Sequence, residues 1–255
     1  MMIEGSSLLL ILAVFLVAGL VKGVVGLGLP TVSLALLAVK LDITLAMTLI
    51  LLPSLTANLW QGFSGGHALA ILRRLWPFLL TATLAVGAGA VTLTRLDPGV
   101  ASALLGLLLI VYGLSHLAGM RFRVPATSEG WLGAVAGTAN GVFTGLTGSF
   151  VVPGVMYLQA PGLPRDMLVQ AMGLLFVLST LALGVSLQGF GIVSADLLLW
   201  SLFAVVPALT GMALGQKIRG RVSEAAFRRL LFLALTLLGG YLLVQSVMGA
   251  AMITS

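Results

Sequence analysis

Hydrophobic residues fill eight long segments of this chain, and polar or charged residues gather in the short stretches between them. The segments cover residues 8–39, 43–63, 75–94, 100–118, 131–160, 167–188, 191–215 and 226–250. A helix needs about 20 apolar residues to cross a bilayer core of about 30 Å. Polar and apolar residues do not alternate within the segments, which argues against a membrane β-barrel. The pattern therefore predicts an all-α polytopic membrane protein.

Composition excludes a soluble domain, because 60% of the residues are hydrophobic and only 8% are charged. The net charge of +6 does not indicate nucleic-acid binding, since the basic residues cluster at segment ends, where they set membrane topology. The absence of cysteine excludes disulfides and thiolate metal sites, and we expect no cofactor or metal. Glu4, with no basic residue, precedes the first segment, which argues against a cleaved signal peptide.

Two segments are interrupted by glycine. Residues 19–30 hold four glycines, Lys22 and Pro30, and residues 137–153 repeat this disruption up to Pro153. Glycine and proline both weaken a helix interior. Paired breaks in the two halves of a membrane protein indicate a binding site at the interface between repeats. The alternative is that the glycines only let helices pack closely in lipid.

The halves, residues 1–120 and 121–255, read as two repeats of four segments within one membrane domain. Five matches occur in the same order in both halves: Gly19/Gly23 with Gly137/Gly141, Ala46–Met47 with Ala171–Met172, Gln61–Gly62–Phe63 with Gln188–Gly189–Phe190, Leu75–Trp76 with Leu199–Trp200, and Arg95 with Arg219. Equivalent loops carry opposite charge bias, which predicts inverted topology.

Segment 8–39 would measure about 48 Å as one helix, which is too long for one straight span and too short for two. Both a re-entrant segment and one long, broken, tilted span fit. If both broken segments are re-entrant, only Lys40 and Arg95 lie on one side, opposite Arg73, Arg74, Arg121, Arg123, Arg165, Lys217, Arg219, Arg221, Arg228 and Arg229. The positive-inside rule favours this sharp division and predicts that both termini lie outside.

The breaks offer chemistry suited to an anion. Backbone N–H groups freed at the start of a half-helix, with the positive end of its dipole, bind negative charge. Lys22 would add a fixed positive charge, or else extend only to the interface. Its equivalent in the second half is the neutral Asn140. The predicted binding residues are Lys22, Gly23, Gly26, Gly28, Asn140, Gly141, Thr144, Gly145, Thr147, Gly148, Ser149 and Gln170.

An intramembrane hydrolase is the alternative function, with Ser149 as nucleophile and His116 as base. Neither a Gly-x-Ser-x-Gly context, an intramembrane Asp pair nor a His-Glu-x-x-His helix occurs. All seven acidic residues fall in loops or at segment ends. We therefore expect a non-enzymatic protein.

The spacing of glycines 19, 23, 26 and 28, and of glycines 137, 141, 145 and 148 with Pro153, resembles the sulfite exporter TauE/SafE family. The resemblance covers residues 8 to 248. It implies a bacterial inner-membrane secondary transporter that exports sulfite, sulfoacetate or related sulfur-containing anions. The family often has a Gly-Gly-Gly run at the first break, where this chain has Gly26-Leu-Gly28. A homodimer is left open.

Overall fold

The computed structural model describes residues 5–120 and 122–253, and within them it contains eleven α-helices and no strand. The all-helical prediction is confirmed for these residues. In chain order the helices are α1 (Gly5–Val25), α2 (Leu29–Leu37), α3 (Ile43–Leu49), α4 (Leu51–Phe63), α5 (Ala68–Leu93), α6 (Pro98–Leu117), α7 (Glu129–Thr147), α8 (Gly154–Gln159), α9 (Arg165–Gly189), α10 (Ala195–Ile218) and α11 (Glu224–Ile253). Two 3₁₀ turns, Ala126–Ser128 and Arg219–Arg221, precede α7 and α11.

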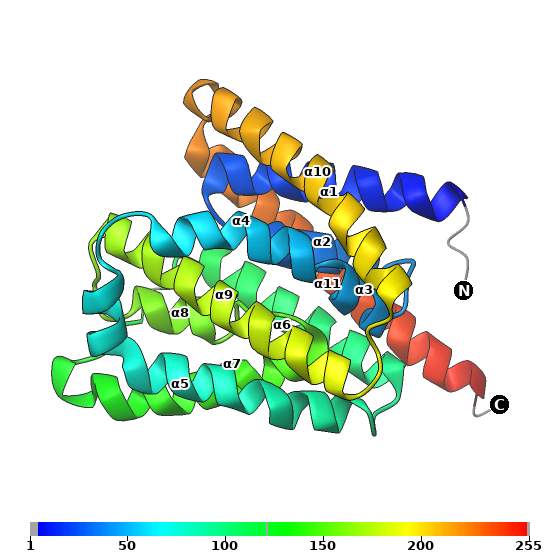
Figure 1. Cartoon of the computed structure of the whole chain (residues 1–255), viewed down its shortest axis with the longest axis horizontal. Helices are drawn as coiled ribbons and strands as arrows, with labels where there is room; N and C mark the ends of the chain where they lie inside the picture. The colour runs from blue at the N-terminus through cyan, green and yellow to red at the C-terminus, as the bar shows by residue number, and fades with distance from the viewer. Residues whose placement is uncertain (1–4, 121, 254–255) are drawn as a thin grey trace.

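Six of these helices are long and apolar enough to cross a membrane: α1, α5, α6, α9, α10 and α11. The bent pair α3–α4 adds a seventh when it is counted as one span. The chain is therefore a multi-pass membrane protein. Segment 8–39 divides into a spanning helix, α1, and a short helix, α2, which folds back along it (Figure 1).

Glycine conformation sets both interruptions. Gly28 precedes α2 with a φ of 107°, and Gly148 follows α7 with a φ of 73°. Both values lie in the left-handed region that glycine occupies without steric cost. Pro30, in the first turn of α2, needs no hydrogen-bond acceptor there.

A third break, between α3 and α4 at Ile50, was not predicted from the sequence. Its cause is Pro53, which has no N–H to donate to the Leu49 carbonyl four residues earlier. Ser201 of α10 compensates: its hydroxyl donates to the Leu49 oxygen at 2.9 Å and accepts the Leu52 N–H at 3.1 Å. The two helices meet at 43°.

Helix α5 begins at Ala68, seven residues before the predicted start at residue 75. Arg73 and Arg74 were assigned to a loop because of their charge. They lie instead in the helix, where a long basic side chain can extend to the interface while its backbone remains helical. Pro77 then produces a kink at Leu75.

Close helix pairs hold the bundle together, and glycine permits the contact. Helix α1 packs against α10, α7 against α5, and α6 against α11. Glycines 137, 141 and 145 of α7 face the carbonyl oxygens of Phe78, Ala82 and Val86, one turn apart on α5. Gly19 and Gly23 of α1 face the carbonyl oxygens of Ala208 and Met212 in the same way.

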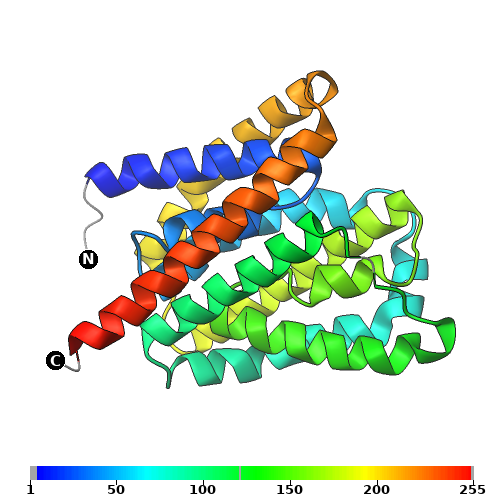
Figure 2. The same ribbon diagram turned by 180° about the vertical axis from the view of Figure 1, so that it is seen from behind.

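The start of α1 and the end of α11 lie at one end of the bundle, together with loops 94–97 and 190–194 (Figures 1 and 2). Loops 64–67, 118–128 (apart from residue 121), 160–164 and 219–223 lie at the opposite end. That opposite end is the basic end, since the described arginines other than Arg95 are in or next to these four loops. Arg121, which the sequence also assigned there, falls outside the described residues.

The α6–α11 contact yields a stability prediction with an adjacent control. A Cβ atom at Gly239 would lie 2.5 Å from the Gly106 oxygen, whereas one at Gly240 would meet nothing within 4 Å. We expect Gly239→Ala to destabilise the fold by about 1–3 kcal/mol, the usual cost of overpacking. Gly240→Ala should be neutral or slightly stabilising, because alanine favours helix. Heating the detergent-purified variants and measuring the monodisperse fraction tests this. Equal midpoints would show that the α6–α11 contact is not tight.

Candidate functional site

A cavity of about 790 Å³ lies at the basic end of the bundle. Its lining comes from α1, the α1–α2 break, α4, the end of α8, α9, α10, the turn after α10 and the start of α11. Ser64 and Gly65 of the α4–α5 loop line it as well, and so do arginines whose side chains are partly exposed to solvent. The cavity therefore opens at the end opposite the start of α1 and the end of α11.

Lys22 lies at the inner part of this cavity with only 4% of its surface exposed. Its ammonium donates to the side-chain oxygens of Asn58 at 2.6 Å and Gln61 at 2.7 Å. Both acceptors are neutral amides, and within the described residues Lys22 forms no ion pair. An ammonium carries three donors, so one remains available to a ligand. The arrangement leaves a buried positive charge without a counter-ion.

A chain of polar side chains continues inward from Lys22. Asn58 donates through Nδ2 to the Ser54 hydroxyl at 3.1 Å, and Ser54 lies 3.3 Å from the Thr180 hydroxyl. Asn58, Ser54 and Thr180 are all buried. Thr180 ends the chain by donating to the Phe176 carbonyl at 2.6 Å. Polar groups thus extend from the cavity to the contact between α4 and α9.

Two glutamines fix α4 to α9 at the cavity wall. Gln61 donates through Nε2 to the Val169 carbonyl at 2.9 Å, while its oxygen holds Lys22. Gln170 donates to the Gly62 carbonyl at 3.0 Å and accepts the His67 N–H at 2.9 Å. Because the oxygen and the nitrogen of each amide both have a partner, the two amides are held in one orientation.

Only some of the predicted binding residues at the first break line the cavity. Lys22, Gly23 and Gly26 line the cavity, together with Gln170. Gly28 is not among the lining residues, and it serves as the left-handed cap of α2. Gly23 also faces the Met212 carbonyl, so one residue brings α10 close and borders the cavity.

The second-break residues are not brought to this cavity. Gly141 and Gly145 lie against α5, and Gly148 lies against Met47 and Leu34. Asn140 accepts the Gly154 N–H at 2.9 Å and so holds the start of α8.

Most hydroxyl groups of the second break donate to backbone carbonyls nearby in the chain. Thr144 donates to the Ser149 carbonyl at 3.0 Å, and Thr147 donates to the Phe143 carbonyl at 2.7 Å. Within the described part of the chain, the Asn140 Nδ2 and Ser149 Oγ atoms are buried without a hydrogen-bond partner. Only these two side chains of the second break retain an unused donor.

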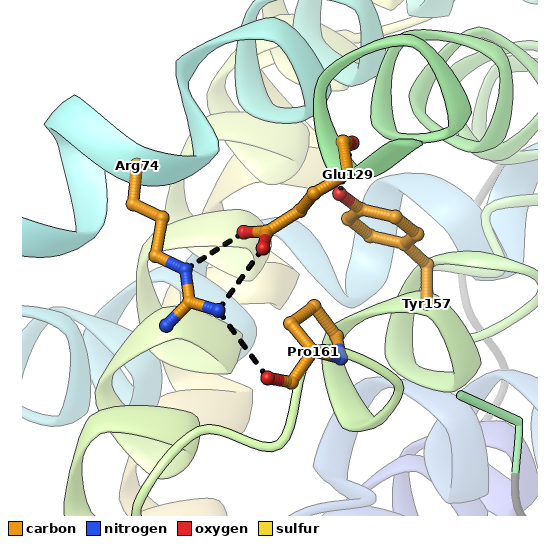
Figure 3. Close-up of polar contacts among 4 residues, drawn as sticks. All are labelled: Arg74, Glu129, Tyr157 and Pro161. Atoms are coloured by element: carbon orange, nitrogen blue, oxygen red, sulfur yellow. Dashed lines mark hydrogen bonds and ion pairs between the residues drawn. The ribbon is translucent and has the colours of Figure 1, made fainter. Parts of the chain in front are cut away.

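A separate cluster fixes α8 at the basic end (Figure 3). Arg74 of α5 makes a two-pronged ion pair with Glu129 of α7, at 2.8 and 3.0 Å, and also donates to the Pro161 carbonyl at 3.3 Å. Tyr157 of α8 donates to the Glu129 carbonyl at 2.7 Å. Paired donors aligned with both carboxylate oxygens are the strong form of this interaction.

The sequence did not identify three of the charged residues at the cavity. Arg165, Arg219 and Arg228 line it, although their charge alone marked them only as topology signals. Gln61 was also absent from the predicted binding residues. Its spacing of three residues from Asn58, which places both on one helix face, was the available signal.

The hydrolase alternative gains no support from the geometry. The Ser149 hydroxyl and the His116 Nε2 atom each lack a hydrogen-bond partner within the described residues, so they are not hydrogen-bonded to each other. His116 is instead stacked on Phe232 of α11.

Comparison with known proteins identifies one family. The chain matches the model of the family described as sulfite exporter TauE/SafE over residues 11–242. No curated protein and no solved structure matches the chain. The family match extends from the second turn of α1 into α11 and so reaches every helix that lines the cavity. The chain therefore belongs to the sulfite exporter TauE/SafE family of membrane transporters.

Proposed function

We propose that this protein is a secondary transporter that exports sulfite, sulfoacetate or related small organosulfonates across the bacterial inner membrane. The observation that carries the proposal is the buried Lys22 ammonium, held by two neutral amides beside a cavity. A charge at this depth is costly unless it is paired. An anion that enters the cavity would supply the missing counter-ion and accept the remaining N–H. The match to the sulfite exporter family supports sulfur-containing anions as that substrate class.

We further propose that the two halves are inverted repeats. Reciprocal packing supports this, because α1 pairs with α10 while α7, its equivalent, pairs with α5, the equivalent of α10. The contact between Ser54 and Thr180 supports it too. These residues are 126 positions apart. The flanking matches Ala46 with Ala171 (171 − 46 = 125) and Gln61 with Gln188 (188 − 61 = 127) have almost the same separation. Equivalent residues in contact lie on a two-fold axis.

The asymmetry between the repeats suits export. Lys22 provides a positive charge at the cavity, and its equivalent Asn140 is neutral. An anion bound first near Lys22 and then passed to the second half would be held less strongly there. Asn140 Nδ2 and Ser149 Oγ, both buried and without partners in the described chain, are the donors that would receive it.

Efflux from proteoliposomes tests the function directly. Vesicles loaded with labelled sulfite should lose it in a saturable way when they contain the protein, and not when they are empty. Sulfoacetate added outside in excess should slow the exchange if both anions share the site. An unsaturable leak equal to that of empty vesicles would contradict transport.

Lys22 substitutions test the site. Lys22→Ala removes a charge-assisted contact worth about 1.5–3 kcal/mol, so sulfite should bind roughly ten- to a hundred-fold more weakly. Lys22→Arg should be milder, because it keeps the charge but changes its shape. Asn140→Ala, the matched control in the other repeat, should cost less. Calorimetric titration of correctly inserted protein measures all four. Equal dissociation constants for the parent, Lys22→Ala and Asn140→Ala would remove both residues from the site.

Orientation can be tested because the chain has no cysteine of its own. We propose that the basic end faces the cytoplasm and the termini face the periplasm, as the positive-inside rule requires. An impermeant thiol reagent applied to intact cells should label Thr94→Cys, at the terminal end, and leave Ser223→Cys unlabelled until the membrane is permeabilised. Both residues are exposed. The reverse pattern would mean that the cavity opens outward.

A further inference from the structure

Three arginines surround the mouth of the cavity, and all three face a single carboxylate. Arg165 begins α9, Arg219 lies in the turn between α10 and α11, and Arg228 lies one turn into α11. Their guanidinium nitrogens are 3.5, 3.8 and 3.9 Å from the carboxylate oxygens of Glu224. Asp166 also lines the cavity, and it forms no ion pair within the described residues. Positive charge therefore exceeds negative charge at the mouth.

The contacts with Glu224 are loose. All three distances exceed the 2.8–3.0 Å of the Arg74–Glu129 pair at the same end of the bundle. The Glu224 side chain is 38% exposed and that of Glu129 is 10% exposed, while the arginines of both groups are 38–69% exposed. Within the described residues, none of the three guanidinium groups donates a hydrogen bond. Exposed ion pairs of this kind contribute little to stability.

Guanidinium groups whose N–H donors are unpaired can bind a small oxyanion. Each presents a planar set of N–H donors that matches the oxygens of a sulfonate, sulfite or similar anion. Because the arginines come from three separate elements, an anion between them could contact more than one side chain at once. In this structure the Glu224 carboxylate, which is attached to the chain, lies among these arginines where a free anion could bind.

We propose that Arg165, Arg219 and Arg228 form a second oxyanion site at the mouth of the cavity, where an incoming anion displaces Glu224 before it reaches Lys22. This inference rests on the proposed function, since it concerns loading of the same cavity. Glu224 thereby keeps the arginines together in the absence of substrate. It also selects for anions that compete better than a single carboxylate.

The test is calorimetric titration of the full-length protein with sulfite, and with sulfate as a chemically stable oxyanion. Glu224→Gln removes the internal competitor, so the dissociation constant should fall about three- to ten-fold. Arg219→Gln, and the more exposed Arg165→Gln in case the first folds poorly, should raise it by about five-fold or more. Arg229→Gln is the matched control. It removes the same charge beside Arg228, but Arg229 does not line this cavity, and the affinity should not change.

Lys22→Ala separates the two sites. Weak oxyanion binding should persist in this variant and disappear in Lys22→Ala/Arg219→Gln. If Glu224→Gln binds no tighter than the parent, or if both arginine variants behave like Arg229→Gln, the mouth site is wrong while the Lys22 site stands. A parent protein that binds neither anion would overturn both proposals. Binding that follows these expectations without efflux from proteoliposomes would overturn transport alone.

Discussion

The burial of the Lys22 charge is the constraint on which the site depends. An ammonium inside a membrane protein must be solvated by the protein, because lipid cannot do so. Here α4 supplies the solvation through Asn58 and Gln61, and Gln61 is itself held by the backbone of α9. Three helices are thereby fixed around one positive charge. Since both acceptors are neutral, the charge is oriented without being cancelled.

Close packing of helices makes this arrangement possible. Glycines on α1 let α10 approach until backbone faces backbone, and glycines on α7 do the same for α5. Such contacts replace the hydrophobic driving force that helices lack in lipid. At Gly23 one residue both completes the α1–α10 contact and borders the cavity. At this break the glycines can therefore serve both helix packing and ligand binding. At Gly141 and Gly145 the observed contacts are those of helix packing.

The sequence was sufficient to predict the features that depend on local residue patterns. Hydrophobic periodicity located the segments and their fold class, and the cost of burying charge singled out Lys22. It did not reach contacts between distant segments. Asn58 and Gln61 lie 36 and 39 residues from Lys22, and only the placement of α4 brings them to it. The break at Ile50 was missed for a similar reason: Pro53 is a local signal, but the Ser201 hydroxyl that compensates for it is 152 residues from Leu49. The mouth arginines were assigned to one end correctly, although charge alone could not show that they meet at Glu224.

The basic end contains two kinds of ion pair. One kind holds its helices together more strongly than the other. Arg74 aligns two donors with both carboxylate oxygens of the buried Glu129, and it also donates to Pro161, which joins α5, α7 and the loop before α9. Glu224 instead shares its charge among three exposed arginines at longer distances. Water and salt screen the second arrangement much more than the first. The α5–α7–α8 side of this end is therefore held firmly. The contacts between the start of α9 and the α10–α11 turn are weak enough for an anion to break them, and they border the cavity that contains Lys22.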